Sequence, residues 1–530
     1  MKPDWQNRLP ELGWAGYMLG LLLALIPFLG GSFEEMGDIA LIARQVHMAA
    51  EWDVLRGAYS RLGFFHIGPV SFYWMALVDY ILPSAWFAEY SHYYQFSIAI
   101  WIANLGMGLA AFHSARKLEL SLLTRILILL LTIAFTWHLG GHVLFSPWGP
   151  HLTIMPVLWF SMNLVRSGNG DFRALPGLAF AAIWILHSHA GSLIFLGPSL
   201  IFLIYLGYKL YRQEKLLTPG LTIPLIVGIV ILLAGLSLPI IEAYQNDGGN
   251  LKAIMDYLSQ NSTWRKPGKA LVFMLSAMDG PFRMGFPLFS IISLGLYVWT
   301  GRKNLGPIEK QLLAISLILL AGSFYGALRT PGVLVPHLFD HLLTINALML
   351  AINLRPVRDK IQPRLLSLLP ANRLSDHNGG LSTNKGPGPF KTSGLLGQGW
   401  IAALLLLFSL LAGTARETSP PDSGFRPSGL LKLLEEKTDF SPNPDSIYRI
   451  ALEKKHLAHW PGAAGLMLQM ERRGLKACIE PPYQILFGPE ALCEGQSNGT
   501  ILIEPLPENP KMKHDNAVFY RNIQVQFRAD

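Results

Sequence analysis

Long apolar runs separated by short polar connections follow one another along most of the chain. Most of the runs reach about 18 residues, the length at which an α-helix crosses the hydrocarbon core of a bilayer. The apolar segments are 14–31, 67–87, 93–114, 121–139, 150–166, 174–190, 192–209, 221–241, 283–300, 310–328, 337–354 and 396–413. This pattern predicts a polytopic membrane domain that is mainly α-helical.

The charge of the connections predicts how the segments are oriented. Lys and Arg gather in one set of connections, which the positive-inside rule assigns to the cytoplasm. These basic connections are 116–117, 166–173, 209–215, 302–303 and 355–364. The opposite, outer side then receives the acidic connection 31–66 and everything from residue 414 onward.

One apolar segment must stay on a single side of the membrane for these assignments to agree. We assign this role to 67–87, because Asp79 and Pro83 interrupt it and because it begins close to the pair Gly68-Pro69. Such a segment is expected to be re-entrant or to lie along the interface. The prediction is then about 11 crossings, with the C-terminus outside.

Composition agrees with a membrane protein and limits its partners. The chain of 530 residues is 51% hydrophobic and only 15% charged, with a mean hydropathy of +0.34. Its net charge of +8 could indicate a nucleic-acid partner. The basic residues nevertheless lie in short clusters between apolar runs, so membrane orientation explains them. We expect the lipid bilayer, and no nucleic acid, as a partner.

The polar C-terminal part predicts a second domain. The expected divisions are a membrane domain (1–370) with its outer connection 31–66, a cytoplasmic Gly- and Pro-rich linker (371–395), a last transmembrane helix (396–413) and a small extracytoplasmic α/β domain (414–530). Within the last division, 445–474 has helical periodicity, whereas 499–504 and 517–527 alternate like strands. Cys478 and Cys493 both fall there, so an outer location would permit a disulfide.

Three acidic residues after the first apolar run are the first candidates for chemistry. Glu34, Glu35 and Asp38 occupy positions i, i+1 and i+4, so that in a helix Glu34 and Asp38 would share a face. A carboxylate held at the membrane surface can act as a general base towards an attacking hydroxyl. The alternative is a solvated loop in which Asp38 caps a helix over 39–50.

Arg61 and His66 follow in the same outer connection, with Arg44 upstream. A guanidinium pairs through two hydrogen bonds with phosphate oxygens, so these residues are candidates to bind the phosphate of a lipid-linked donor. The alternative is ordinary contact with lipid headgroups.

Histidines concentrate at the outer ends of the predicted helices. They are His138, His142, His151, His187, His189, His337 and His341. Imidazoles four residues apart can ligate a transition metal, so a divalent metal stays open. We interpret them instead as hydrogen-bonding groups of a polar cavity, and we expect no cofactor. The motifs of zinc proteases and P-loop ATPases do not occur in the sequence.

Taken together, these motifs resemble those of the GT-C class of polytopic glycosyltransferases, in particular the family related to protein O-mannosyltransferases and lipid A aminoarabinose transferases (family 39-like). The resemblance covers about residues 12–355. It is carried by Gly37-Asp38-Ile-Ala-Leu-Ile-Ala-Arg44, Gly57-x-Tyr59-Ser60-Arg61-x-Gly63-Phe-x-His66-x-Gly68-Pro69, Ser146-Pro147-Trp148-x-Pro150-His151, His187-Ser-His189-Ala-Gly191 and Gly248-Gly-Asn250-Leu251.

The resemblance implies a multi-pass protein of the bacterial inner membrane that moves a sugar from a polyprenyl-phosphate donor to a cell-envelope glycan, lipid or protein. An acid of the first outer loop would be the catalytic base. Asp38 is the first choice, but the adjacent Asp-Glu pair of better-known members is absent, and alignment on 42–44 favours Glu35. The substrate-binding residues would be Tyr59, Arg61, His66, Arg44, His142, His151, His189 and Asn250.

Two other functions remain open at this stage. One is a flippase or transporter of lipid-linked sugars, in which the same acids and arginines would bind headgroups along a path. The other is a glycan polymerase or ligase that uses a lipid-diphosphate glycan. The polar residues gather in outer loops and at helix ends, a distribution that favours a one-sided active site over a translocation path.

Overall fold

The structure of the protein is a computed structural model. It describes residues 5–29, 33–87, 91–213, 220–279, 290–292, 295, 305–354, 407–414, 429–452, 459–493, 495, 497–505, 517–520 and 523–529. The predicted linker 371–395 lies outside the described residues, as do most of the apolar segments 283–300 and 396–413.

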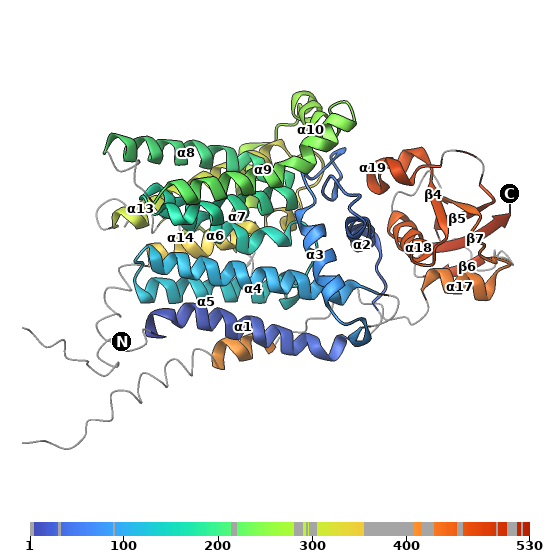
Figure 1. The fold of residues 1–530 in the computed structure, drawn as a ribbon, viewed down its shortest axis with the longest axis horizontal. Coiled ribbons are helices and arrows are strands. Elements are labelled where there is room, and N and C mark those ends of the chain that lie inside the picture. Colours follow the sequence, from blue (N-terminus) through green and yellow to red (C-terminus); the bar gives the residue numbers. More distant parts are fainter. Residues whose placement is uncertain are drawn as a thin grey trace, which may run out of the picture.

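Long helices lie side by side in the membrane domain (Figure 1). Six helices of the described residues are long and apolar enough to cross a membrane. In this part of the chain the long helices are α1 (Leu9–Leu25), α4 (Tyr93–Lys117), α5 (Leu122–Leu139), α8 (Leu193–Arg212), α9 (Thr222–Gln245) and α13 (Pro307–Arg329). The predicted helical membrane domain is therefore confirmed.

Shorter helices form the middle of the bundle. Apart from Trp159, every residue of α6 (Ile154–Gly168) is buried, and so is every residue of α14 (His341–Asn353). A helix that is apolar all round belongs in an interior, where other helices cover each of its faces. Two more helices complete this part, α7 (Leu175–Ser188) and α11 (Pro267–Asp279). Short 3-10 turns connect many of the elements: Trp5–Arg8, Ile26–Phe28, Ser84–Trp86, Gly141–Leu144, His151–Thr153, Phe172–Ala174, Ala190–Ser192 and Pro336–Phe339.

Helices α2 (Gly37–Ala50) and α3 (Val70–Ile81) lie across one end of the bundle, transverse to the long helices (Figure 1). A small hairpin of β1 (Tyr59–Ser60) and β2 (Phe64–Phe65) connects them, and α10 (Gly249–Gln260) lies at the same end. The path of α3 therefore differs from that of the long helices, and the re-entrant or interfacial course of 67–87 stays a prediction.

The C-terminal part contains a five-stranded mixed sheet in the order β4-β3-β5-β7-β6. Strand β3 is parallel to β4 and β5, and the remaining pairs are antiparallel. The strands are β3 (Ile447–Leu452), β4 (Lys476–Ile479), β5 (Gly499–Pro505), β6 (Ala517–Tyr520) and β7 (Ile523–Ala529), and the helices are α17 (Leu430–Lys437), α18 (Trp460–Arg472) and α19 (Gln484–Phe487), with short turns at Pro481–Tyr483 and Pro489–Ala491. This confirms the α/β prediction.

Part of the helix predicted over 445–474 is a strand. Residues 460–472 are helical, but β3 occupies 447–452 and pairs with both neighbouring strands. The segment of β3 is short enough to fit both the helical and the strand period of hydrophobicity. The β-branched Ile447 and the aromatic Tyr448 favour the strand.

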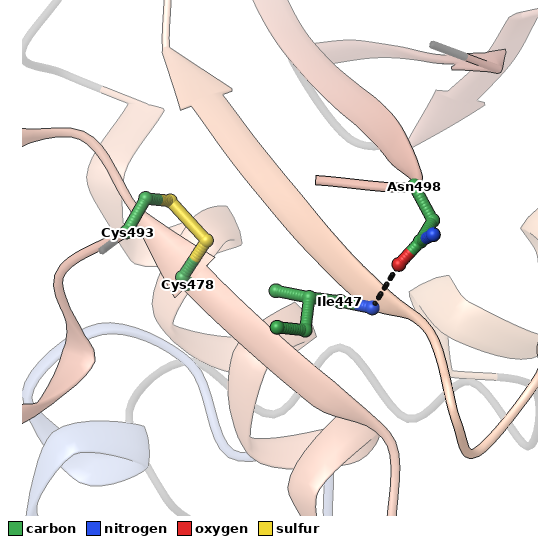
Figure 2. The surroundings of a disulfide bond; sticks show 4 residues. All are labelled: Ile447, Cys478, Cys493 and Asn498. Atoms are coloured by element: carbon green, nitrogen blue, oxygen red, sulfur yellow. Dashed lines mark hydrogen bonds between the residues drawn. A yellow bond between two sulfur atoms is a disulfide. The ribbon is translucent and has the colours of Figure 1, made fainter. Parts of the chain in front are cut away.

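A disulfide joins Cys478 of β4 to Cys493 (Figure 2). Next to it, the amide N–H of Ile447 donates a hydrogen bond of 2.8 Å to the side-chain oxygen of Asn498. These contacts tie the loop that precedes β5 to the start of β3.

The C-terminal domain shares a hydrophobic core with the end of the membrane domain. Ile42 and Val46 of α2 and Met75 of α3 belong to the same buried cluster as Leu434 of α17 and Met467 of α18. Figure 1 shows α18 beside α2. The C-terminal domain is therefore packed directly on the segment 31–66, which carries the predicted acids.

Candidate active site

Asp38 lies in the first turn of α2, where the chain turns from an extended segment into the helix. Gly37 begins the helix with a φ of +57°, a backbone conformation that glycine adopts more readily than any other residue. The N-cap residue is Met36, and it makes no side-chain capping hydrogen bond. Asp38 therefore does not hold the N-cap position that a purely structural role would assign to it.

The carboxyl group of Asp38 accepts two side-chain hydrogen bonds. The hydroxyl of Tyr59 donates to Oδ1 at 2.5 Å, and the indole of Trp148 provides the second bond. Burial raises the pKa of Asp38 above its ordinary value, while the two hydrogen bonds act in the opposite direction. A carboxylate with a raised pKa accepts a proton more readily, as a general base requires.

Asp38 faces a cavity of ≈ 580 Å³ between the segment 31–66 and the bundle. Of the residues predicted to bind substrate, four line it with Asp38: Tyr59, Arg61, His66 and His189. Other lining side chains come from α10 and the residue after it, from α13, and from the start of α14 and the turn before it: Tyr257, Asn261, Ser323, Arg329, His337 and His341. Polar groups from distant parts of the chain thus converge on one space beside Asp38.

Two guanidinium groups form a positive region of this cavity. Arg61 donates to the backbone oxygen of Val333 at 2.7 Å, and Arg329 donates to that of Asn261. Burial raises the pKa of Tyr257, and the electrostatic effects of Arg329 and Arg61 partly oppose that shift, which places both cations near the same phenol. Among the described residues, neither arginine forms an ion pair with a carboxylate.

His66 is held in one tautomer by the backbone. Its Nδ1 accepts the amide N–H of Ala190 at 3.1 Å, which leaves the proton on Nε2. Burial lowers the pKa of His66 to about 3, with the neighbouring His189 contributing in the same direction. His66 is therefore neutral near pH 7, so it can offer the cavity a hydrogen bond but no positive charge.

Asn250 does not line the cavity. Its side-chain oxygen accepts the amide N–H of Phe65 at 2.7 Å, and its NH₂ group donates to the backbone oxygens of Phe65 and His66. Glu242 in turn accepts the amide N–H of Asn250 at 2.9 Å. These contacts make Asn250 a positioning residue for the hairpin that carries His66.

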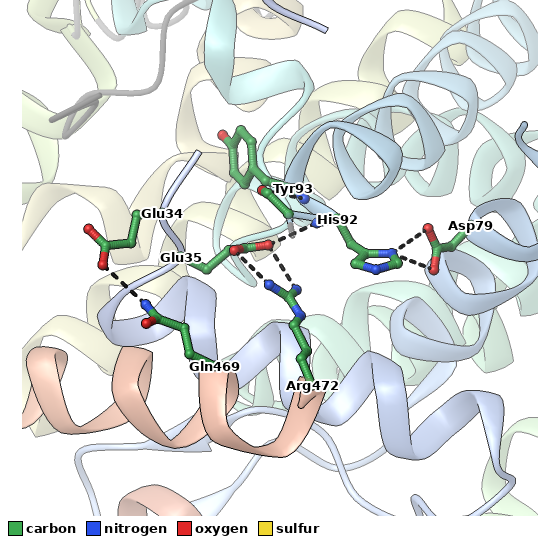
Figure 3. Close-up of polar contacts among 8 residues, drawn as sticks. Glu34, Glu35, Asp79, His92, Tyr93, Gln469 and Arg472 are labelled. Carbon is green, nitrogen blue, oxygen red and sulfur yellow. Dashed lines mark hydrogen bonds and ion pairs between the residues drawn. The ribbon is translucent and has the colours of Figure 1, made fainter. Parts of the chain in front are cut away.

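Glu35 and Arg44 point towards the C-terminal domain rather than into the cavity. Glu35, which is 4% exposed, receives two hydrogen bonds of 2.9 Å from Arg472 and one of 3.1 Å from the amide of His92 (Figure 3). Arg44 donates to both oxygens of Glu471. The structure thus separates the two acids proposed as base, because Asp38 lines the cavity and Glu35 does not.

His142 and His151 also lie beside the cavity rather than in its wall. Their rings are 6.1 Å apart, and Nε2 of His151 lies 3.4 Å from Oδ2 of Asp340. Among the described residues, no three His, Cys, Asp or Glu side chains are placed to hold a metal ion.

Sequence reasoning did not select Arg329 and Tyr257 as site residues. Arg329 ends α13 on the predicted outer side, where the positive-inside rule makes a basic residue unusual. This departure from the rule could have identified Arg329 as a candidate site residue. Tyr257 carried no comparable signal, because exposed and buried tyrosines are both common at the ends of membrane helices.

Comparisons with known proteins find similarity in the fold. No family model matches the sequence, and no curated protein matches it. The crystal structure of ArnT from Cupriavidus metallidurans bound to undecaprenyl phosphate matches with a TM-score of 0.54 and 12% identity, over 99% of this chain and 98% of that chain. The archaeal oligosaccharyltransferase AglB from Archaeoglobus fulgidus, in complex with an inhibitory peptide and a dolichol-phosphate, matches with a TM-score of 0.51 and 11% identity, over 95% and 70% of the two chains.

Both neighbours are GT-C membrane proteins, and ArnT matches this chain over nearly the whole length of each. The match therefore includes the bundle, the helices that cross its end and the C-terminal domain. This chain has the fold of the GT-C class of polytopic membrane glycosyltransferases.

Proposed function

We propose that this protein transfers a sugar from a polyprenyl-phosphate donor to a hydroxyl group of a cell-envelope glycan, lipid or protein. Asp38 is the base, and Arg61 and Arg329 bind the donor phosphate. The observation that carries the proposal is the cavity itself, which is lined by the partly buried carboxyl group of Asp38 and by two arginines that form no ion pair with a carboxylate of the described residues. A positive region of this kind suits a phosphate ester.

The mechanism follows from these positions. The acceptor hydroxyl gives its proton to Asp38 while its oxygen forms a bond to the anomeric carbon of the sugar, with inversion. The bond between that carbon and the phosphate oxygen breaks, and polyprenyl phosphate leaves with the electron pair. The guanidiniums of Arg61 and Arg329 stabilise the charge that develops on the phosphate. Nε2–H of His66 is a hydrogen-bond donor in the same cavity.

The structural neighbours support this choice of donor. The ArnT structure contains undecaprenyl phosphate and the AglB structure contains a dolichol-phosphate, and both ligands are polyprenyl-type phosphates. We place the protein in the bacterial inner membrane with Asp38 and the C-terminal domain on the outer side. We propose no cofactor for the reaction.

Release of free polyprenyl phosphate tests the proposal. Purified wild-type protein is incubated with candidate polyprenyl-phosphate sugars and a cell-envelope extract as acceptor, and the lipid product is measured by mass spectrometry. We expect release by the wild type and a loss of at least roughly 100-fold in Asp38→Asn, because loss of a general base costs about 10²–10⁴ in rate. Donor binding is expected to persist in the variant.

Asp53→Asn is the matched control, because Asp53 is an exposed carboxylate of the same outer segment. Full activity in Asp38→Asn would reject Asp38 as the base and move that role to Glu35. Donor binding without release, in the wild type and with every acceptor fraction, would contradict a transferase and favour a transporter of lipid-linked sugars.

A further inference from the structure

Helix α18 of the C-terminal domain packs against the short segment that carries Asp38. Gln469 donates to Glu34 at 3.1 Å, and Arg472 makes its bidentate contact with Glu35 (Figure 3). Glu471, between these two donors, pairs with Arg44 at 2.7 Å. The contacts of α18 therefore hold the chain before Asp38, at Glu34 and Glu35, and after it, at Arg44.

Backbone contact is as close as the side-chain contact. A Cβ atom added to Gly465 of α18 would lie 2.9 Å from the backbone oxygen of Glu35, and one added to Gly37 would lie 3.3 Å from Cβ of Pro461. Cβ atoms essentially never approach a carbonyl oxygen as closely as the first of these distances. The two glycines thus let α18 lie directly against the start of α2.

The same domain reaches the groups around Asp38. The ring of Trp460, at the start of α18, lies edge-on to Tyr59 with a centroid distance of 5.8 Å, and Tyr59 donates to Asp38. Leu486 of α19 lines the cavity, and the backbone oxygen of Phe487 accepts a hydrogen bond from Arg44. The C-terminal domain therefore forms part of the cavity wall.

We propose that α18 is a positioning clamp for the catalytic carboxylate, and that Arg472, Glu471 and Gly465 are positioning residues for the transfer reaction. The inference rests on the proposed function. Two charge pairs and a close backbone contact fix α2, and α2 fixes Asp38 relative to the donor phosphate. Arg61 and Arg329 do not contact α18 in the described residues, so the clamp sets the place of the base without setting donor affinity.

The test separates turnover from donor binding. Arg472→Ala, Glu471→Gln and Gly465→Ala are each expected to lower kcat roughly 10- to 100-fold, because a displacement of about 1 Å at a reacting group costs rates of that order. The dissociation constant for the polyprenyl-phosphate donor should change by less than about twofold. Arg472→Lys keeps the positive charge but loses the planar two-pronged contact, so it should recover part of the lost kcat.

Two controls match these changes. Arg473→Ala removes the arginine that directly follows α18, whose partner, Glu435, lies within the C-terminal domain. Gly106→Ala adds a methyl group to α4 at a place where no described atom outside the helix's own local backbone lies within 4 Å. Both controls should keep the wild-type kcat. Among the three clamp variants, Gly465→Ala is the one least expected to unfold the C-terminal domain, because alanine favours a helix over glycine.

Three outcomes decide the inference. Wild-type kcat in all three clamp variants would overturn it while leaving the proposed function intact. A loss in Arg472→Ala alone, with Glu471→Gln and Gly465→Ala unchanged, would also overturn it, because that result would tie Arg472 to Glu35 as the base. Absence of transfer by the wild type would instead contradict the proposed function itself.

Discussion

At Asp38, burial and hydrogen bonding act in opposite directions on one carboxyl group. Burial raises its pKa, and the bonds from Tyr59 and Trp148 lower it. The raised pKa makes the carboxylate of Asp38 a stronger proton acceptor than a carboxylate in water. As the pH falls through this raised pKa, Asp38 becomes protonated and transfer should stop.

Tyr59→Phe should move the acidic limb of the pH–rate profile to higher pH. The substitution removes a hydrogen bond that lowers the pKa of Asp38, and Trp148 alone then opposes the effect of burial. The measurement is kcat for polyprenyl phosphate release across the acidic and neutral range. Tyr73→Phe is the control, because Tyr73 bonds to the backbone oxygen of Val54 instead. An acidic limb that moves to lower pH would contradict this assignment.

The sequence identified Glu35 and Asp38 as candidate bases, but it did not show which of the two lines the cavity. Glu35 and Asp38 have the same chemistry and lie three positions apart, so spacing alone left both open as the base. Their different environments depend on Arg472, which is 437 positions from Glu35, and on Trp148. Neither contact leaves a local signal in the sequence around the acids.

The turn between α9 and α10 holds the hairpin that presents Arg61 and His66. The side chain of Asn250 makes three hydrogen bonds to the backbone of Phe65 in β2 and of the adjacent His66. The carboxylate of Glu242 accepts a hydrogen bond from the amide N–H of Asn250. Gly249 adopts a φ of +43°, and a Cβ atom added to it would lie 2.5 Å from a carboxylate oxygen of Glu242. The turn therefore has no room for a side chain at this position. The position of the hairpin therefore depends on the turn between α9 and α10, which is far from it in the sequence.

Asn250→Ala should therefore weaken both folding and donor binding. Loss of three buried hydrogen bonds is expected to lower the free energy of unfolding by about 2–3 kcal/mol, at about 1 kcal/mol for each bond. Thermal unfolding in detergent and titration with polyprenyl phosphate measure the two effects. Asn246→Ala is the matched control, because Asn246 bonds to Glu242 and not to the hairpin. Weaker donor binding with unchanged stability would show that Asn250 contacts the ligand directly.

Element positions were predictable where length and apolar character decide them. The apolar runs 93–114, 121–139 and 310–328 all became long helices because a bilayer accepts few other structures. The error over 447–452 arose because a segment of six residues is too short to distinguish the helical from the strand period of hydrophobicity. Pairing with β4 and β5 decided between them, and such tertiary pairing is not local information.

In the whole molecule, the disulfide stabilises the C-terminal domain on which the clamp depends. Replacement of Cys478 and Cys493 by serine opens a loop with a sequence separation of 15 residues. A loop of that size corresponds to about 3 kcal/mol of stability. We expect a lower unfolding temperature for the double variant, and the same shift when the wild type is measured under reducing conditions. Identical melting of oxidised and reduced wild type would contradict this expectation.

The division into a membrane part and a polar C-terminal part could be predicted from composition, but the contact between them could not. Ile42 of α2 and Met467 of α18 belong to one buried cluster, yet each has an ordinary place in the amphipathic pattern of its own helix. Such a pattern shows which face is buried and not which partner covers it.

The order in which the chain is made gives the packing of α18 on α2 one more consequence. A ribosome completes Glu35 early and Arg472 437 residues later. Once Arg329 has been made, both arginines that we propose to bind the donor exist, while the contact that we propose to fix Asp38 does not. If the proposed function holds, we expect a chain that ends between Arg329 and Arg472 to bind the donor without transferring its sugar, and activity to begin only when the C-terminal domain folds against the segment that carries Asp38.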